Sequence, residues 1–292
     1  MTQLVFLYSK VLLHWGFTVR QPGASAAQSA YIIPPPTTII GAYANPLARI
    51  LNLPDALDSR RKTPVSNKLM ECALKSTISA SASLHQSQGN TGIILFEEPS
   101  RIMGTPYKGG GSYEQAVKQP IYQSIQELLP VQAVGSASGP HVVMGLAWLL
   151  DKDRLGDCLG IEVTLEHFQR AAYNVYRVGS REGIANPVSD GEPRVYSGGD
   201  LEVRDLGQFS SLLYQDAECV KPVNATDVVE VVLLSQDYSE RNYYVPALPG
   251  SGPSILLPPP PEPVQFKLRS GCSVAYPRED AGLALAFRRD RL

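Results

Sequence analysis

Residues 31–42 read YIIPPPTTIIGA, and this stretch marks the point where an extended segment gives way to a helix. Three consecutive prolines at 34–36 can continue neither a strand ladder nor a helix, so the chain must change conformation there. Thr37 or Thr38 carries a hydroxyl that can cap a helix beginning after the prolines. Over 39–51 the apolar residues then recur at helical spacing, and Pro46 is expected to kink that helix or to end its first part.

Further elements follow on both sides of this stretch. Upstream, residues 4–19 are rich in β-branched, aromatic and leucine residues, which favours one long strand or two strands broken at Ser9 and Lys10. Downstream, residues 52–90 are mostly polar and small, whereas 91–97 is a clear strand and 113–129 has the pattern of a helix. Residues 142–150 form an apolar run of strand length that also permits a helix, and 164–176 has the spacing of an amphipathic helix. Strands are predicted at 184–188, 228–235, 264–268, 272–276 and 283–287.

The order of these elements predicts an α+β fold. The predicted elements follow one another as strand, helix, strand, long insertion, strand, helix and strand. This is the β-α-β-β-α-β order of the ferredoxin-like split βαβ unit, which is also the plan of the RRM. A strand-rich tail follows it from about residue 195.

Composition limits the class of protein. The chain has 292 residues with 24 glycines and 24 prolines, and 43% of its residues are hydrophobic, which excludes a disordered chain, a coiled coil and a collagen. The formal net charge is −2, so a nucleic-acid partner would have to meet a local basic patch. No run of 18 apolar residues occurs, so no membrane span is expected.

The four cysteines, Cys72, Cys158, Cys219 and Cys272, are far apart and form no C-x-x-C pair. We expect them to pack as small core thiols, which fits a reducing compartment and a cytoplasmic location.

The sequence lacks the usual catalytic signatures. It contains no G-x-x-x-x-G-K-[ST], no G-x-S-x-G and no H-E-x-x-H motif. Its four histidines are scattered, and we expect His14 and His141 to be packed residues rather than catalysts. No catalytic residue, no metal ligand and no cofactor is therefore predicted.

Three loops carry side chains suited to nucleic acid. Tyr107 and Lys108 precede three glycines, so they either stack on a base and meet a phosphate or belong to a flexible surface connection. Arg177 and Arg181 flank Gly179-Ser180, a turn that suits an anion, although Gly179 could also be the left-handed cap of the preceding helix. Arg20 and Gln28, with Tyr31, form another polar cluster before the prolines.

Two of these stretches resemble a known family. The segment from Arg20 to Ala42 resembles the N-terminal motif of the CRISPR-associated protein 5 (Cas5) family, an aromatic residue, Pro-Pro, Ser/Thr-Thr, two apolar residues and Gly. Tyr176-Arg-Val-Gly-Ser-Arg-Glu-Gly183 resembles the Arg-x-Gly-Ser-Lys/Arg-Glu motif of the archaeal subtype I-A branch. Together the motifs cover about a tenth of the chain, and their order and spacing also fit.

The resemblance implies an RRM-like domain of the RAMP superfamily over residues 1–190, with a thumb-like insertion at about 98–140, and a β-rich C-terminal region over 191–292. It implies a subunit of Cascade, the RNA-guided surveillance complex, that grips the 5′ handle of the CRISPR RNA (crRNA). The implied partners are the helical-backbone subunit and the large subunit, with possible contact to target DNA near the PAM and none to a membrane.

On this reading ten residues would meet the RNA. Arg20, Arg177, Arg181 and Lys108 would contact phosphates; Gln28, Thr38 and Ser180 would donate to bases or sugars; Tyr31 or Tyr107 would stack; and Gly179 would let the backbone approach the anion.

A branch of the family cleaves precursor crRNA with a tyrosine, a lysine and a histidine. This chain departs from that set, because Tyr43 has no Lys-His pair to accompany it and Lys108 is followed by glycine. A non-catalytic scaffold is therefore expected. The alternatives left open are a metal-independent endoribonuclease, for which the RNA's own 2′-OH would be the nucleophile, and an interaction protein that contacts no RNA.

Overall fold

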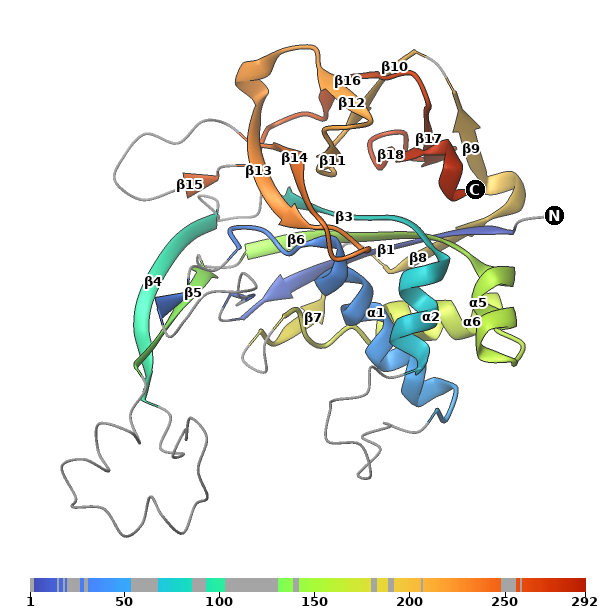
Figure 1. The fold of residues 1–292 in the computed structure, drawn as a ribbon, viewed down its shortest axis with the longest axis horizontal. Coiled ribbons are helices and arrows are strands. Elements are labelled where there is room, and N and C mark those ends of the chain that lie inside the picture. The colour runs from blue at the N-terminus through green and yellow to red at the C-terminus, as the bar shows by residue number, and fades with distance from the viewer. Residues whose placement is uncertain are drawn as a thin grey trace, which may run out of the picture.

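An antiparallel sheet of five strands forms the middle layer of the molecule (Figure 1). Its order is β3-β6-β1-β7, and β8 also pairs with β1. The strands are β1 (Leu4–Leu13), β3 (Thr77–His85), β6 (Val142–Asp151), β7 (Ala185–Pro187) and β8 (Arg194–Ser197). Because β6 pairs antiparallel with both β1 and β3, those two strands run in the same direction.

This computed structural model describes residues 3–14, 16–17, 19, 27–28, 31–53, 68–85, 93–102, 131–138, 142–179, 183–188, 192–205, 207–247, 256–257 and 259–292. The predicted helix at 113–129 lies outside these ranges.

Helices cover one face of the sheet and the C-terminal strands cover the other (Figure 1). The helices are α1 (Pro36–Ile50), α2 (Lys68–Ser76), α5 (Lys152–Leu159) and α6 (Leu165–Tyr173). Side chains of β1 alternate accordingly: Val5, Leu7 and Val11 join the core beneath the helices, while Phe6 and Tyr8 join the core beneath the C-terminal strands. The mixed architecture of helices and antiparallel strands that the sequence predicts is confirmed.

Of the two alternatives for the first apolar segment, the uninterrupted strand is confirmed, although it ends at Leu13. β1 runs without interruption through Ser9 and Lys10. Ser9 is fully buried, and its hydroxyl donates to the carbonyl oxygen of Ala172 in α6 at 3.2 Å. A polar residue can occupy a buried strand position when its hydrogen bond is made inside the protein.

The expected start of the first helix needs correction, and so does the alternative in which Pro46 ends its first part. α1 begins at Pro36, and neither Thr37 nor Thr38 caps it, because the N-cap is Pro35 and makes no side-chain hydrogen bond. Proline suits the first helical position, where its fixed φ is already helical and no N–H is needed. The helix continues through Pro46 to Ile50, since Pro46 and its neighbours Tyr43 and Leu47 are buried against the sheet.

An aromatic stack fixes α1 and α6 on the sheet. The ring of Tyr43 stacks on Trp148 of β6 with centroids 6.0 Å apart, and Phe168 of α6 meets Trp148 edge-on at 6.3 Å. The Tyr43 hydroxyl donates to the carbonyl oxygen of Leu146 at 2.7 Å. These contacts place the C-terminal half of α1 beside the end of α6, where the candidate site lies.

Within the polar and small stretch 52–90, where no element was predicted, the structure has α2 and β3. β3 has the sequence TISASASLH, and Ser79 and Ser81 donate to carbonyl oxygens of residues distant in sequence. Ser81, for example, is fully buried and donates to the carbonyl oxygen of Tyr214 at 2.7 Å.

The four strands predicted near the C-terminus are confirmed as β13 (Val228–Leu234), β16 (Val264–Leu268), β17 (Cys272–Pro277) and β18 (Leu285–Arg288). They belong to three small antiparallel sheets, β10-β16-β12, β11-β14-β13 and β18-β17-β9. The remaining strands are β9 (Leu201–Arg204), β10 (Gln208–Ser211), β11 (Gln215–Asp216), β12 (Val220–Pro222) and β14 (Glu240–Pro246).

A separate four-stranded sheet has the order β15-β4-β5-β2. It contains β2 (Ala27–Gln28), β4 (Ile93–Ile102), β5 (Val131–Ser138) and β15 (Leu256–Leu257). β4 and β5 pair antiparallel, and β4 confirms the strand predicted at 91–97.

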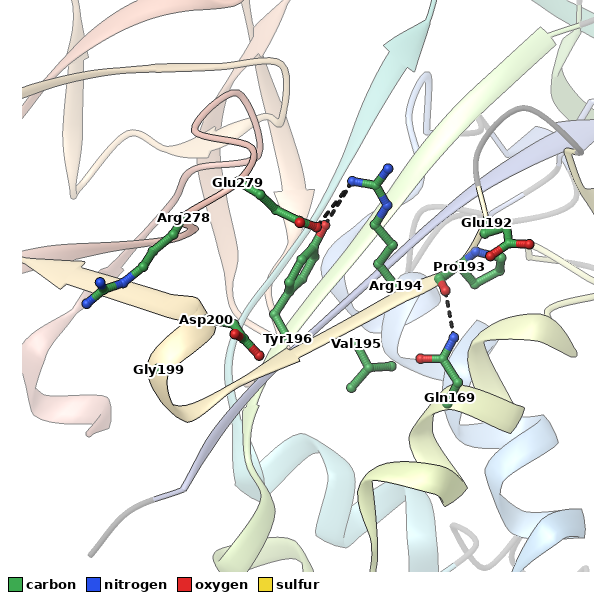
Figure 2. Close-up of a pocket in the computed structure, with 10 residues that line it drawn as sticks. All are labelled: Gln169, Glu192, Pro193, Arg194, Val195, Tyr196, Gly199, Asp200, Arg278 and Glu279. Carbon is green, nitrogen blue, oxygen red and sulfur yellow. Dashed lines mark hydrogen bonds and ion pairs between the residues drawn. The ribbon is translucent and has the colours of Figure 1, made fainter.

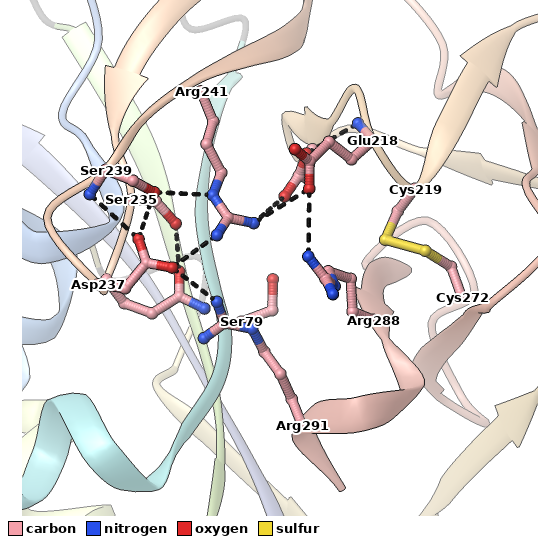
Figure 3. A network of polar contacts seen from close by, with 12 residues as sticks. Ser79, Glu218, Cys219, Ser235, Asp237, Ser239, Arg241, Cys272, Arg288 and Arg291 are labelled. Carbon is pink, nitrogen blue, oxygen red and sulfur yellow. Dashed lines mark hydrogen bonds and ion pairs between the residues drawn. A yellow bond between two sulfur atoms is a disulfide. The ribbon is translucent and has the colours of Figure 1, made fainter.

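The prediction of four unpaired thiols is wrong. Cys72 of α2 is bonded to Cys158 of α5, and Cys219 is bonded to Cys272 of β17, the pair drawn in Figure 3. The two cysteines of each pair are 86 and 53 residues apart in sequence, so no local spacing predicts the pairing. The cysteines therefore give no argument for a reducing compartment.

No helix within the described ranges is long and apolar enough to cross a membrane. Within the same ranges, no group of three or more histidine, cysteine, aspartate or glutamate side chains is arranged to hold a metal ion.

Candidate nucleic-acid interface

The side of α1 that faces away from the core carries only small and polar side chains. Thr37, Gly41, Asn45 and Arg49 are four residues apart, so they form one stripe along the helix. The first three are partly exposed and Arg49 is exposed, whereas Ile40, Tyr43 and Leu47 point into the core. The stripe ends at Arg49, in the last turn of the helix.

The neighbouring segment leads out of α6. Thr164 caps this helix, and its hydroxyl accepts from the backbone N–H of His167 in a capping box. α6 ends at Tyr173, so the predicted helix to 176 is three residues too long. Arg177 then bridges to Ile184, and the N–H of Ala185 donates to the carbonyl oxygen of Tyr176 at 2.9 Å.

Tyr176 brings the two segments together. The Arg49 guanidinium donates to the Tyr176 hydroxyl at 3.1 Å, and that hydroxyl donates to Asn45 Oδ1 at 3.3 Å. The guanidinium carbons of Arg49 and Arg177 lie 5.3 and 6.0 Å from the centre of the Tyr176 ring. We call Asn45, Arg49, Tyr176 and Arg177 the Tyr176 cluster.

The chemistry of the Tyr176 cluster suits single-stranded nucleic acid. Tyr176 is 39% exposed beside the guanidinium groups of Arg49 and Arg177, and Tyr173, at the end of α6, is 44% exposed. Arginine forks match phosphate geometry, and unpaired bases stack on exposed aromatic rings for about 1–3 kcal/mol per base. The two arginines have no carboxylate partner among the described ion pairs, so their charge is available to an anion.

Of the ten residues predicted to bind RNA, the structure places Arg177 in this cluster, and Gly179 follows two residues later. Gly179 has a φ of 78°, the left-handed conformation expected of a turn glycine. It is not the cap of α6, because the C-cap of that helix is Asn174, five residues earlier. Arg177 to Ile184 instead close a loop in which the N–H of Val178 donates to the carbonyl oxygen of Gly183 at 2.8 Å.

The other predicted residues lie elsewhere or outside the described ranges. Thr38 is in the first turn of α1, about 16 Å along the helix from Arg49. The backbone of Gln28 pairs with Val134 of β5, in the sheet that contains β4 and β5. Arg20, Tyr107, Lys108, Ser180 and Arg181 lie outside the described residues.

The stacking role predicted for Tyr31 is wrong. Tyr31 is 4% exposed and packs in the core beneath the helices, so its ring offers no face to a base. The expectation of a packed His14 is also wrong, because His14 is exposed; its backbone N–H donates to the carbonyl oxygen of Ile184 at 3.1 Å.

Asn45 and Arg49 are functional candidates that the sequence reasoning missed. Their signal was present in the helical spacing, since they occupy the face opposite Ile40, Tyr43 and Leu47. What the spacing does not reveal is that this face ends beside Tyr176, because that depends on the packing of α1 and α6 around Trp148.

A surface hollow of about 740 Å³ lies beyond α6, between β8 and the turn after β17 (Figure 2). Three carboxylates and two arginines line it, so its lining is net acidic, and Arg194 pairs with Glu279 at 3.4 Å and donates to the Tyr196 hydroxyl at 3.3 Å. Gln169 donates to the carbonyl oxygen of Pro193 at 2.7 Å. The hollow is therefore a weaker candidate for an anion than the Tyr176 cluster.

Comparison with known proteins identifies short regions of high similarity. "CRISPR-associated protein Cas5 3" of Saccharolobus solfataricus is 58% identical over 40 residues, 13% of this chain and 17% of that protein. "CRISPR system aCascade subunit Cas5 1" of the same organism is 55% identical over 40 residues with the same coverage. No family model matches the chain.

The whole chain also has a structural neighbour. A crystal structure of a CRISPR protein from Archaeoglobus fulgidus aligns over 97% of this chain and 99% of that one, with a TM-score of 0.55 and 14% sequence identity. At this identity the likeness shows a shared fold. The resemblance to the Cas5 family is confirmed. The match spans only about a sixth of the length of the curated Cas5 relatives.

From Tyr31 onward, where the structure describes it continuously, the first Cas5-like motif mostly serves the fold. Tyr31 is buried, the carbonyl oxygen of Pro34 accepts from the Tyr214 hydroxyl at 3.1 Å, and Pro36 starts α1. Only its last residues reach the exposed stripe, where a Cβ on Gly41 would meet no described atom within 4 Å. The second Cas5-like motif is the one that supplies Tyr176 and Arg177 to the cluster.

Proposed function

We propose that this chain is a non-catalytic, RNA-binding Cas5-type subunit of a subtype I-A Cascade that holds the 5′ handle of crRNA. The observation that carries the proposal is the Tyr176 cluster, an exposed tyrosine between two arginines, within the motif that resembles the I-A branch. The names of the curated relatives, which include an aCascade subunit, support the assignment.

The low net charge favours a site completed by other subunits. With a formal charge of −2, the free chain should attract RNA weakly, and its basic residues act locally. We therefore expect the handle to be bound where this subunit meets the helical-backbone and large subunits. We also expect the complex to be located in the cytoplasm.

The finer architecture belongs to the same proposal. The two connections that pass from β1 to β3 and from β6 to β7 each skip one strand, which is the arrangement of a ferredoxin-like or RRM-like domain. The boundaries at 1–190 and 191–292, and a thumb-like insertion at about 98–140, stay predictions.

The test is co-expression with the neighbouring Cascade genes and a CRISPR array, followed by pull-down and sequencing of the bound RNA. We expect guide RNAs with one shared 5′ end, and we expect the double variant Arg49→Glu, Arg177→Glu to lose them. Tyr176→Leu alone should weaken handle binding about 5- to 150-fold, the loss of one stacked base. Each phosphate contact removed should also flatten the slope of log affinity against log salt by about 0.7.

The chain offers a matched control. Arg204 also lies over a tyrosine ring, that of Tyr276 at 5.2 Å, but it belongs to β9 in the C-terminal region. Arg204→Glu should leave handle binding intact. If Arg204→Glu and the double variant Arg49→Glu, Arg177→Glu lost the same amount of handle binding, the effect would come from overall charge and not from the Tyr176 cluster. If the pull-down recovered partner subunits without protected RNA ends, the result would favour an interaction protein that contacts no RNA.

Cleavage of precursor crRNA is the alternative, and the position of Tyr43 weighs against it. Tyr43 is fully buried, and burial raises the pKa of its hydroxyl far above the usual value. A hydroxyl that donates to Leu146 inside the core cannot reach a substrate. Incubating repeat RNA with the purified protein in EDTA tests this directly. Cleavage of the RNA at equal concentrations of RNA and protein would favour the endoribonuclease and contradict the non-catalytic scaffold.

A further inference from the structure

The sheet β11-β14-β13 ends in a long apolar strand, and no described strand pairs with its outer side. β13 is the edge of this sheet, because β14 lies between it and β11. Its seven residues, VVEVVLL, are four valines, two leucines and one glutamate. Figure 1 shows β13 along the margin of the C-terminal strands, on the side away from β9 and β18.

The pairing with β14 shows which backbone groups of β13 point away from the sheet. In the register of the two strands, the N–H of Ala247 donates to the carbonyl oxygen of Asp227 at 3.1 Å, and the N–H of Ser235 donates to Ser239 at 2.8 Å. Hydrogen-bonded positions alternate along an antiparallel strand, so the odd-numbered residues bond to β14 and the even-numbered residues turn their N–H and C=O groups outward. Among the described residues, none bonds to these outward groups of Val228, Glu230, Val232 and Leu234.

The side chains along this edge are apolar except for one carboxylate. Val232 is 51% exposed and Glu230 is exposed, whereas Val231 and Leu233, on the opposite face, are buried. Asn242 of β14 donates to Glu230 Oε1 at 2.6 Å, which holds the carboxylate in place. No cation in the described ranges pairs with Glu230, so its negative charge is uncompensated.

The other edges of this part of the chain are protected. The remaining edge strands of the C-terminal sheets have only two to four residues, and β12 also carries a lysine and a proline. The long edge strand β3 of the central sheet is covered, since the N–H of Tyr214 donates to the carbonyl oxygen of Ala82 at 3.0 Å. Soluble proteins shorten, charge or cover their edge strands to prevent unwanted pairing. The open edge of β13 is therefore suited to receive a strand.

The charge of Glu230 decides which strand fits. If two copies of β13 paired antiparallel over most of their length, their Glu230 carboxylates would lie directly opposite or diagonal to each other, with no cation between them. Like charges in opposite strand positions are destabilising, whereas opposite charges and β-branched neighbours stabilise a pair. An extended segment with a basic residue at this position complements the edge better than a second copy does.

We propose that β13 is a docking edge for an extended, antiparallel segment of another protein, with a lysine or arginine opposite Glu230 and apolar residues opposite Val228 and Val232. In this mode of strand addition, main-chain hydrogen bonds supply the affinity and alternate side chains supply the specificity. The edge belongs to the C-terminal strands, whereas α1 and α6 cover the opposite face of the central sheet (Figure 1). The inference goes beyond the proposed function and can fail independently of it.

The experiment titrates the full chain into a fluorescein-labelled peptide, Thr-Val-Thr-Lys-Thr-Val-Thr, and follows binding by fluorescence anisotropy. In the proposed register the peptide lysine is opposite Glu230, and the valine and lysine N–H groups face the edge. Methylating the two valine N–H groups should weaken binding at least about 5-fold, because two hydrogen bonds are lost. Methylating the N–H groups of the two inner threonines, which face away from the edge, should leave the affinity unchanged.

A charge exchange tests the register. Glu230→Lys should weaken binding of the lysine peptide, and should tighten binding of the same peptide with glutamate in place of lysine, by about 2- to 5-fold each. Glu162→Lys is the matched control, because it makes the same change of charge at an exposed position between α5 and α6 and should alter neither affinity. Both variants should keep handle RNA in the pull-down, which separates this edge from the Tyr176 cluster.

Three results would overturn the proposal. The first is no binding of the peptide up to its solubility limit, and the second is equal weakening by the two methylation patterns. The third comes from sedimentation of the chain alone, for which we expect a monomer. A dimer that Val232→Pro converts to a monomer would assign the edge to a second copy. Because the N–H of Val232 points outward, this proline removes no hydrogen bond from the β13-β14 pair.

Discussion

At the scale of single residues, Gly145 shows how closely the central sheet is filled. It lies in β6 between β1 and β3, opposite Lys10 and Ser83. The space beside it holds a hydrogen-bonded group in which His85 Nε2 is 2.7 Å from the Tyr8 hydroxyl and 2.9 Å from Ser83 Oγ. Burial raises the pKa of Tyr8 well above its usual value, so this hydroxyl stays protonated.

Gly145→Ala should therefore destabilise the protein. A Cβ at this position would come within 3 Å of Ser83 Oγ, the Tyr8 hydroxyl and His85 Nε2, which would have to move apart. Overpacking of this kind costs about 1–3 kcal/mol, and a thermal unfolding curve measures it. Gly41→Ala is the control: its Cβ meets no described atom within 4 Å, so it should gain up to about 1 kcal/mol of helix propensity. Equal Tm values for the two variants would contradict the packing argument.

At the scale of elements, the Cys72–Cys158 disulfide ties α2 to α5 beneath the sheet. It closes 86 residues of sequence, and a cross-link of that span stabilises by about 4–5 kcal/mol in the chain-entropy model. Cys72→Ala, Cys158→Ala should lower Tm markedly, and a reductant should do the same to the unmodified chain. Because the Cys219–Cys272 disulfide closes 53 residues, its double variant should lose slightly less. A Tm that does not respond to reductant would rule out this contribution.

The elements also show which parts of the fold could be predicted. The helices α1 and α6 can be predicted from apolar periodicity, and β6 from an uninterrupted apolar run. In these elements the buried positions carry apolar side chains, so the sequence itself indicates which positions are buried. β3 does not, since its serines and threonines look solvent-exposed until their partners are known. Thr77, for instance, donates to Ala73 at 2.7 Å and accepts from the Trp148 indole at 2.8 Å.

The same limit applies to the candidate site. Arg177 and Gly179 could be found from a local turn pattern with flanking arginines. Arg49 could not, because its relation to Tyr176 arises only when α1 and α6 pack on the same aromatic residue of β6. The disulfides could not be predicted for a similar reason, because the paired cysteines come together only in the folded chain.

At the scale of the whole molecule, the C-terminus is fastened to both halves of the chain (Figure 3). Arg241 of β14, with its side chain 14% exposed, meets Asp216, Glu218 and Asp237. Arg291 pairs with Asp237 at 3.1 Å, and the Arg154 guanidinium of α5 donates to the carbonyl oxygens of Arg291 and Leu292 at 3.2 Å. This network joins the C-terminal strands to the helical layer.

The network should make stability depend on pH through Asp237. Partial burial opposes ionisation of this carboxyl, but hydrogen bonds from Ser239 and the charges of Arg241 and Arg291 outweigh it and lower its pKa below the ordinary value. A carboxyl with a lowered pKa in the folded state stabilises the protein above its unfolded pKa of about 3.9, and this contribution disappears as the pH falls through the folded pKa.

Asp237→Asn should accordingly lower Tm at pH 7 by about 2 °C, in line with the modest worth of a partly exposed pair, and should match the unmodified chain at acid pH below the folded pKa. Asp216→Asn is the control of opposite sign. It also contacts Arg241, but burial raises its pKa, so neutralising it should leave Tm at pH 7 unchanged or higher. Thermal unfolding across pH 2–8 measures both variants. If Asp237→Asn lowered Tm by the same amount at every pH, Asp237 would act through its shape and hydrogen bonds. Its charge would then make no contribution to holding the C-terminus in place.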